Sequence, residues 1–358
     1  MGRPWLSIDL AKIEENARAI VRTCAQHGIG VTGVTKATCG SSAVARAMLR
    51  GGVSSLGESR LENVARLRAA GVECPIMLLR VPALSRVDEV VQAVDLSLDS
   101  EPAVLAGLAE AARRRGGMHP VILMVDLGDL REGIWPDDLL RIARETVRLE
   151  GLRLAGVGTN LTCYGGVIPS EGLMQGFVAR VEDVERTLGR RLPWISGGSS
   201  SALTLIHEGK MPPRVNHVRI GEAILLGRET VERRPWPGTA QDAFRLHAEI
   251  VELKRKPSLP VGDRTADAFG RYRHFEDHGL RERALLDVGR EDVDVEGLTP
   301  VDPRIQVLGA SSDYLVLDVT DARNELRVGG EIAFAPSYGA LLAAMDSEYV
   351  EKRYRGGS

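Results

Sequence analysis

One lysine near the start of the chain stands where an amine could act as a nucleophile. Lys36 lies in segment 33–40 (GVTKATCG), after an apolar, β-branched run and before a series of small residues. A strand that ends in this way can hold an ammonium group at the mouth of an α/β barrel. Removal of water there lowers the pKa of the amine, which can then form a Schiff base. The alternative is a solvated lysine that caps a strand.

Three further segments follow hydrophobic runs and carry polar or glycine residues suited to binding a small molecule. They are 126–133 (DLGDLREG), 196–201 (SGGSSS) and 218–222 (VRIGE). Taken together with Lys36, these segments come in the order that a barrel-bound pyridoxal phosphate site needs.

Arg219, in the last of these segments, is suited to contact the ring nitrogen of that cofactor. An arginine keeps its proton at physiological pH, so it donates a hydrogen bond to a pyridine nitrogen and leaves that nitrogen unprotonated. The ring is then a weaker electron sink, and a carbanion beside it is reprotonated quickly. The alternative, a surface arginine after an edge strand, is disfavoured by the flanking Val218 and Ile220.

Two glycine-containing turns offer bare backbone amides of the kind that bind phosphate. Ser199 and Ser200 lie in the first turn and Gly221 in the second. Either turn alone could be an ordinary loop. Two such turns on successive strands match the usual phosphate position in a barrel of this type.

Polar residues in two other strand-end loops could line a pocket. Arg131 could pair with a substrate carboxylate or with the cofactor phenolate through charge-assisted bonds. An ion pair with Asp126 or Glu132 is the alternative, and the spacing does not exclude it. Segment 159–165 (TNLTCYG) follows another apolar run and adds further polar side chains to the expected pocket.

Composition indicates a globular enzyme of the cytoplasm. The chain has 358 residues, of which 44% are hydrophobic and 27% charged, and its net charge is −3. Interspersed charges of both signs give no footprint for nucleic acid or an anionic membrane. No apolar stretch approaches 18 residues, and we expect no membrane segment and no signal peptide. Cysteines and histidines have no metal-type spacing, so we expect no metal site.

The order of apolar runs predicts a (β/α)8 barrel followed by a smaller β-domain. Eight candidate strands, most of them followed by a helical pattern, are 31–34, 54–56, 75–81, 96–98, 120–126, 154–158, 194–196 and 218–226. Helical periodicity then nearly vanishes, and the later candidate strands are 246–253, 284–288, 305–308, 314–319 and 331–334. We therefore expect a barrel over 9–235 and a β-domain over 236–358, joined by an N-terminal strand within 1–8.

Several long strings carry a resemblance to a known family. They are 126–133, 160–165, 218–230 (VRIGEAILLGRET) and 309–319 (GASSDYLVLDV). Over nearly its whole length the chain resembles the fold-type III pyridoxal phosphate enzymes typified by alanine racemase. Within that family it is most similar to the ornithine racemase branch.

The resemblance implies roles for the residues singled out above. Lys36 would carry the cofactor as an internal aldimine and serve as one of two racemisation bases. Arg219 would contact the pyridine nitrogen, and Arg131 the phenolate oxygen or the substrate carboxylate. The residues implied to complete the cofactor site are Asn160, Ser199, Ser200, Gly221 and Tyr338.

The resemblance also implies a head-to-tail homodimer. In such a dimer the β-domain of one subunit completes the barrel mouth of the other. Ser312 and Asp313 would then act on the substrate across that interface.

Three departures from the alanine racemase pattern concern the second base. Arg290 stands where that enzyme has its catalytic tyrosine, Asn160 replaces the histidine that supports the tyrosine, and Cys39 replaces a tyrosine beside the lysine loop. Base and supporting histidine change together, which suggests a different second base and not an inactive enzyme. The candidates, in order of preference, are Cys163, Tyr338 and Asp292.

The leading prediction is a racemase of ornithine or a related basic amino acid. The side-chain ammonium of such a substrate needs an acidic partner, for which Glu222, Asp292 and Asp294 are candidates. A broader racemase that also takes lysine, arginine, serine or alanine is the alternative. A decarboxylase of this fold type is disfavoured because that branch has an acid where Arg219 stands. A non-catalytic carrier of pyridoxal phosphate is disfavoured because such carriers lack a second domain.

Overall fold

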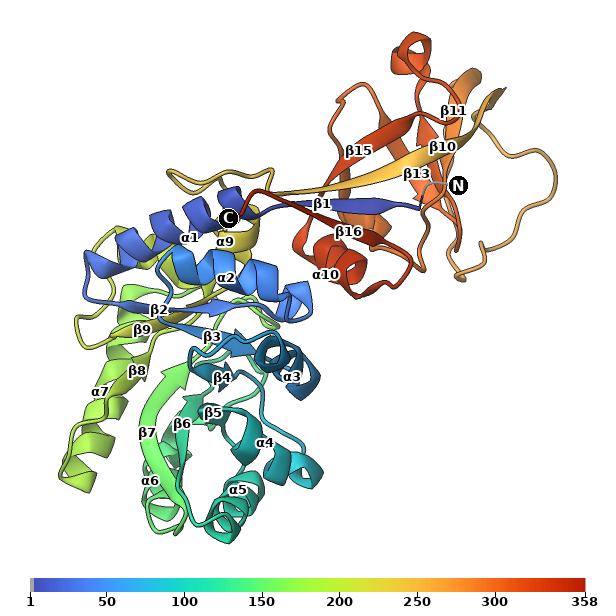
Figure 1. Ribbon diagram of the computed structural model, residues 1–358. Helices are drawn as coiled ribbons and strands as arrows, with labels where there is room; N and C mark the ends of the chain where they lie inside the picture. The colour runs from blue at the N-terminus through green and yellow to red at the C-terminus, as the bar shows by residue number, and fades with distance from the viewer. Residues whose placement is uncertain (1–2, 358) are drawn as a thin grey trace. The chain divides into compact units, whose positions relative to one another are not determined.

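The computed structural model describes residues 3–357, and the chain divides into two compact units. One unit is Leu10–Gln241, and the other combines strand β1 (Trp5–Asp9) with Asp242–Gly356 (Figure 1). Ala240 remains with the first unit because it exchanges two hydrogen bonds with the side chain of Asn16, at 2.7 and 2.9 Å. The division therefore lies a few residues beyond the boundary expected from the sequence.

The first unit is a closed barrel of eight parallel strands. The strands are β2 (Gly30–Val34), β3 (Ser55–Glu58), β4 (Ile76–Leu78), β5 (Leu96–Asp99), β6 (His119–Val125), β7 (Leu152–Thr159), β8 (Trp194–Ser196) and β9 (His217–Ile220). β9 pairs with β2 and closes the barrel. The carboxyl ends of all eight strands therefore meet at one rim, where barrels of this type hold their chemistry.

Helices alternate with these strands along the chain. They are α1 (Leu10–Ala25), α2 (Ser42–Arg50), α3 (Leu61–Ala69), α4 (Val87–Ala93), α5 (Pro102–Arg114), α6 (Leu139–Thr146), α7 (Glu171–Leu188), α8 (Leu203–His207) and α9 (Glu222–Leu226). Within residues 3–357, no helix is both long enough and apolar enough to cross a membrane.

The prediction of a last barrel strand over 218–226 was wrong in its second half. β9 ends at Ile220, and after Gly221 the chain turns into α9. All residues of α9 after Glu222 are buried, and the Asn16 side chain of α1 donates a hydrogen bond to the Ile224 carbonyl at 2.9 Å. A short, wholly apolar run has no periodicity that separates a buried strand from a buried helix.

Apolar side chains from neighbouring strands pack together on one side of the barrel. One core cluster joins strands β4 to β7 and consists of Met77, Leu96, Leu98, Ile122, Met124 and Ala155, with Leu79 and Trp194 packed against it. The barrel is thus a packed core and not a pore. Side chains that act on a ligand must come from its rim.

The second unit is a mostly antiparallel sheet. Its strands are β1, β10 (Phe244–Pro257), β11 (Leu280–Leu286), β12 (Leu298–Pro300), β13 (Gln306–Ala310), β14 (Leu315–Asp318), β15 (Glu331–Pro336) and β16 (Glu351–Arg355). β1 pairs with β10 and β16. The predicted fold class, a (β/α)8 barrel with a second, mostly β domain, is confirmed. One helix, α10 (Tyr338–Asp346), was not anticipated, because its residues are nearly all apolar or small.

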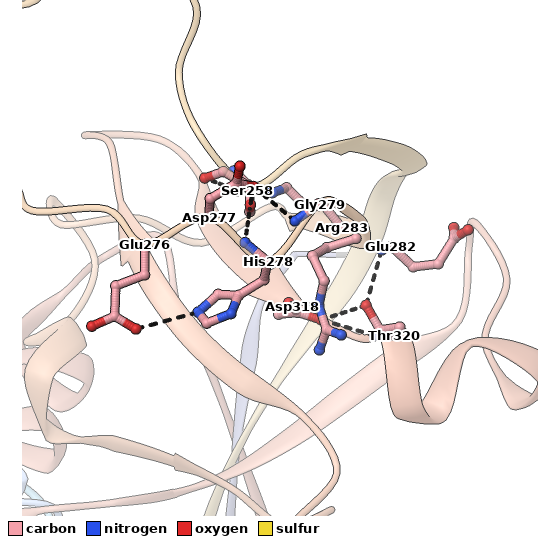
Figure 2. A network of polar contacts seen from close by, with 10 residues as sticks. Ser258, Glu276, Asp277, His278, Gly279, Glu282, Arg283, Asp318 and Thr320 are labelled. Atoms are coloured by element: carbon pink, nitrogen blue, oxygen red, sulfur yellow. Dashed lines mark hydrogen bonds and ion pairs between the residues drawn. The ribbon is translucent and has the colours of Figure 1, made fainter.

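A polar network closes the base of the long loop between β10 and β11 (Figure 2). The Ser258 hydroxyl donates to Asp277 at 3.2 Å and accepts from the backbone N–H of His278 at 2.7 Å. Arg283, on β11, donates to the Ser258 carbonyl at 2.9 Å. These bonds hold the two ends of the loop together.

Candidate active site

Lys36 lies at the barrel rim, two residues beyond the end of β2. It begins the one-turn 3₁₀ helix Lys36–Thr38 and is partly buried. Its amine makes no hydrogen bond or ion pair with any residue that the structure describes. Burial raises the pKa of the carboxyl groups of Glu58 and Glu222, and the positive charge of Lys36 acts against both rises. The Lys36 amine therefore has no bonded partner among the described residues, and its charge interacts with the carboxyl groups of Glu58 and Glu222.

The two predicted phosphate-binding turns touch each other. The Ser200 hydroxyl accepts a hydrogen bond from the backbone N–H of Ala223 at 3.2 Å, and the N–H of Arg219 donates to the Gly198 carbonyl at 2.9 Å. Gly221 also packs against β2, where an added Cβ would come within 3.0 Å of Val34 Cβ. The structure thus brings both turns together beside the strand that leads to Lys36.

Arg219 is almost fully buried, with 5% of its surface exposed. One terminal nitrogen of the guanidinium donates to the Ser196 hydroxyl, and the other donates to the Thr159 carbonyl at 2.8 Å. Burial lowers the pKa of Arg219 to about 10. Arg219 is therefore still charged at neutral pH, and its position is fixed by β7 and β8.

A buried chain of polar groups behind Arg219 was not anticipated from the sequence. His217 contacts the Ser196 hydroxyl through Nδ1 at 2.8 Å and the Thr32 hydroxyl through Nε2 at 2.7 Å. Burial lowers the pKa of His217 to about 3, so its ring is neutral. The Ser196 hydroxyl therefore links the His217 ring to the Arg219 guanidinium. The alternation of His217 and Arg219 on one face of β9 was the available signal.

Arg131 pairs with Glu132, one of the two partners left open by the sequence. Its guanidinium donates to Glu132 Oε1 at 2.5 Å. The other candidate, Asp126, instead accepts the backbone N–H groups of Gly128 and Leu130 at 2.8 and 3.2 Å. The charges of Glu132 and Arg131 both influence the pKa of Arg219. A direct role of Arg131 toward cofactor or substrate stays a prediction.

Asp129, a second residue that the sequence did not single out, organises the loop after β7. Its buried carboxylate accepts four backbone N–H groups at 2.9 to 3.1 Å, from Thr162, Cys163, Tyr164 and Val167. Burial alone would raise the pKa of Asp129, but these donors outweigh it and the pKa is lowered. The loop that carries the exposed thiol of Cys163 therefore has a fixed backbone, and Cys163 acts electrostatically on Arg219.

Asn160 begins the same loop and has an unused donor. Its side-chain nitrogen Nδ2 is buried and has no hydrogen-bond partner within the described residues. An orphaned buried donor costs roughly 1–3 kcal/mol. The position thus suits a ligand that offers an acceptor.

Glu222 already forms an ion pair within the protein. Its carboxylate pairs with Arg233 at 2.7 Å, and the Arg233 side chain is largely exposed. A cation that binds at Glu222 would therefore compete with this exposed arginine.

The remaining candidates belong to the other unit. Tyr338 is the first residue of α10, and the turn between β13 and β14 carries Ser312 and Asp313, whose side chains bond to each other at 2.8 Å. Asp292 is buried and accepts the backbone N–H of Gly289 at 3.0 Å. Arg290 pairs with Glu296 at 2.7 and 2.9 Å. Their proposed roles stay predictions.

Within residues 3–357, no group of three or more His, Cys, Asp or Glu side chains is arranged to hold a metal ion.

Comparison with known proteins identifies the family to which the barrel is related. The family described as alanine racemase, N-terminal domain, matches residues 8–229. The chain belongs to the alanine racemase family. The resemblance seen in the sequence is therefore confirmed, and the match spans nearly the whole barrel, including Lys36 and Arg219.

Two relatives of this alanine racemase family member align from end to end. A lysine racemase from Thermotoga maritima is 41% identical over 354 residues, 99% of each chain. An ornithine racemase from Acetoanaerobium sticklandii is 40% identical over 350 residues, 98% of this chain and 99% of the relative.

Solved structures agree on the fold. Alanine racemase from Bartonella henselae, solved with covalently bound pyridoxal phosphate, superposes with a TM-score of 0.76 at 16% identity, over 99% of this chain and 100% of that chain. Alanine racemase from Streptomyces lavendulae superposes with a TM-score of 0.75 at 20% identity, over 100% and 98%.

Proposed function

We propose that the chain is a pyridoxal phosphate-dependent racemase of ornithine, lysine or a related basic amino acid. The observation that carries the proposal is the unpaired amine of Lys36 beside two touching turns and a buried arginine. This site lies in a chain that aligns end to end with an ornithine racemase and a lysine racemase. The sequence identities to the two relatives, 41% and 40%, are nearly equal, and we therefore propose basic amino acids as the substrate class.

The residues at the rim fit pyridoxal phosphate. Lys36 would hold the cofactor through its amine, and Arg219 would face the ring nitrogen. The orphaned Nδ2 of Asn160 is a donor for which the cofactor offers acceptors. The groups that would bind phosphate are the hydroxyls of Ser199 and Ser200 and the backbone N–H of Gly221. The role of Tyr338 toward the phosphate stays a prediction. When bound, this group supplies a ring that delocalises the charge left on the substrate α-carbon after loss of its proton.

Arg219 limits how strongly that charge is stabilised. Its pKa of about 10 keeps the guanidinium protonated at neutral pH. A donor that does not release its proton leaves the ring nitrogen unprotonated. Ser196 and the Thr159 carbonyl hold the guanidinium in place. Because a ring with an unprotonated nitrogen is a weaker electron sink, quick return of a proton to the α-carbon is favoured over side reactions.

Racemisation needs an acid–base group on each face of the α-carbon. Lys36 serves one face. We propose Cys163 for the other, because its thiol is exposed on a loop fixed by Asp129 and lies in the electrostatic reach of Arg219. Tyr338 is the second candidate. Asp292 ranks third, because it is buried and already caps the turn at Gly289.

Substrate selection would combine groups from two subunits. Glu222 is proposed to receive the side-chain ammonium, displacing Arg233, and Arg131 to receive the carboxylate. Ser312 and Asp313 are exposed in a turn of the second unit, as the proposed head-to-tail homodimer requires.

The test is racemisation of a panel of L-amino acids, followed by chiral chromatography. Ornithine and lysine are expected to give equal amounts of both enantiomers, and alanine and serine little product. Rapid turnover of alanine and serine would instead support the broad-specificity alternative. No turnover of any amino acid by protein that binds pyridoxal phosphate would favour the carrier.

A further inference from the structure

Glu58 is a buried acid to which the proposed reaction gives no role. It is the last residue of β3 and is 0% exposed. Oε1 accepts the Thr35 hydroxyl at 2.6 Å, and Oε2 accepts the Asn63 amide at 3.0 Å and the Ser59 N–H at 3.3 Å. No arginine or lysine forms an ion pair with it in the described part of the chain. A buried carboxylate is costly unless its oxygens are hydrogen-bonded, as they are here.

The donors to Glu58 flank the segment that carries Lys36. Thr35 directly precedes Lys36, and its backbone N–H donates to the Gly57 carbonyl at 3.1 Å. At the other end, Gly40 packs on Asn63 so closely that an added Cβ would lie 2.8 Å from the Asn63 carbonyl oxygen. Both ends of segment 35–40 therefore rest on the β3–α3 connection.

Arg66 of α3 completes this connection. Its Nη1 donates to the Cys39 carbonyl at 2.7 Å and to Asn63 Oδ1 at 3.0 Å. Because Oδ1 is used by Arg66, the Asn63 amide nitrogen is the group that faces Glu58. A glutamine would accept from Asn63 and Ser59 through its oxygen and would turn its amide nitrogen toward the Thr35 hydroxyl, which can also accept. The change would therefore keep the partners but replace charge-assisted bonds by weaker neutral ones.

We propose that Glu58 is a positioning residue for Lys36, because it clamps segment 35–40 through Thr35 and Asn63. This inference rests on the proposed function of Lys36. Burial raises the pKa of Glu58, and the hydrogen bonds from Thr35, Asn63 and Ser59, followed by the charge of Lys36, act against that rise. Glu222 is the other acid within electrostatic reach of this amine.

The experiment compares Glu58→Gln with Asp99→Asn. Asp99 is also a fully buried acid at the end of a barrel strand, bonded to Ser97 at 2.6 Å, so it controls for loss of a buried charge in general. Hydrogen exchange in segment 35–41 is measured on cofactor-free full-length protein. Racemisation and the rate of pyridoxal phosphate loss are measured on the holoenzyme.

Glu58→Gln is expected to speed hydrogen exchange in segment 35–41 by roughly tenfold, because charge-assisted bonds to Thr35 and Asn63 become weaker neutral ones. It should also speed cofactor loss, while Asp99→Asn changes neither readout. Unchanged exchange in segment 35–41 of Glu58→Gln would overturn the inference. Absence of racemisation in the wild type would refute the proposed function alone, since hydrogen exchange is measured without cofactor.

A second pair of variants covers the case in which Glu58→Gln does not fold. Thr35→Val removes the hydroxyl donor to Glu58, whereas Thr35→Ser keeps it. Thr35→Val should reproduce the faster exchange, and Thr35→Ser should keep the wild-type rate. Equal behaviour of the two variants would contradict the clamp.

Discussion

Replacement of Arg219 by glutamate tests how the buried guanidinium supports the reaction. The change removes donors from two buried acceptors, the Ser196 hydroxyl and the Thr159 carbonyl. Each orphaned acceptor costs about 1–3 kcal/mol, so Arg219→Glu should lower the free energy of unfolding by roughly 2–6 kcal/mol. That is less than the stability of many domains, and a folded variant is expected.

Arg219→Glu should also lower the rate of racemisation at saturating cofactor. A mispaired buried charge costs about 3–5 kcal/mol, which corresponds to a fall of roughly a hundred- to several-thousand-fold in rate. Transamination should rise at the same time, because the ring nitrogen would then face an acid that can protonate it. Arg219→Gln is the matched control, since it removes the charge without introducing an opposite one.

The assay is racemisation of ornithine and lysine by chiral chromatography, with pyruvate-dependent transamination and chemical unfolding measured on the same samples. Arg219→Gln should lose racemisation without the gain in transamination. Wild-type racemisation and an unchanged visible absorbance in a folded Arg219→Glu protein would refute the role given to Arg219.

Two other predictions concern a thiol and a buried acid. Cys163→Ala should keep the visible absorbance of the bound cofactor but lose racemisation, with α-proton exchange into solvent surviving for one enantiomer, while Cys74→Ser leaves both unchanged. Near-normal racemisation in Cys163→Ala would move the search to Tyr338 and Asp292. Burial raises the pKa of Asp99 from 3.8 to about 7, so its contribution to stability is fully present below about pH 3.8 and is lost as the pH rises toward and through 7. Asp99→Asn should therefore gain a few kcal/mol over wild type between pH 4 and 7.5 in urea unfolding, and a constant difference across that range would contradict the assignment.

The sequence could reveal residues whose position follows from strand order alone. Lys36 and Arg219 end or follow parallel strands, and the ends of such strands meet at one rim whatever the details of packing. Glu58, Asp129 and His217 were missed because their importance depends on which backbone or hydroxyl groups face them. Such partners come from neighbouring strands and loops, and no local pattern encodes them.

Two helices without an amphipathic periodicity also could not be predicted from the sequence. The apolar α9 was taken for the end of a strand, and α10 was not anticipated, because in each the burial comes from tertiary packing and not from an amphipathic pattern. The partner of Arg131 stayed open between Asp126 and Glu132, because the choice depends on the conformation of the loop.

The most direct test of the central claim is the site of covalent attachment of pyridoxal phosphate. Purified holoenzyme is reduced with borohydride, digested and mapped by mass spectrometry. The phosphopyridoxyl group should be found on the peptide that contains Lys36 and should be absent from Lys36→Ala. Attachment at Lys12, Lys210, Lys254, Lys256 or Lys352 in place of Lys36 would contradict the account.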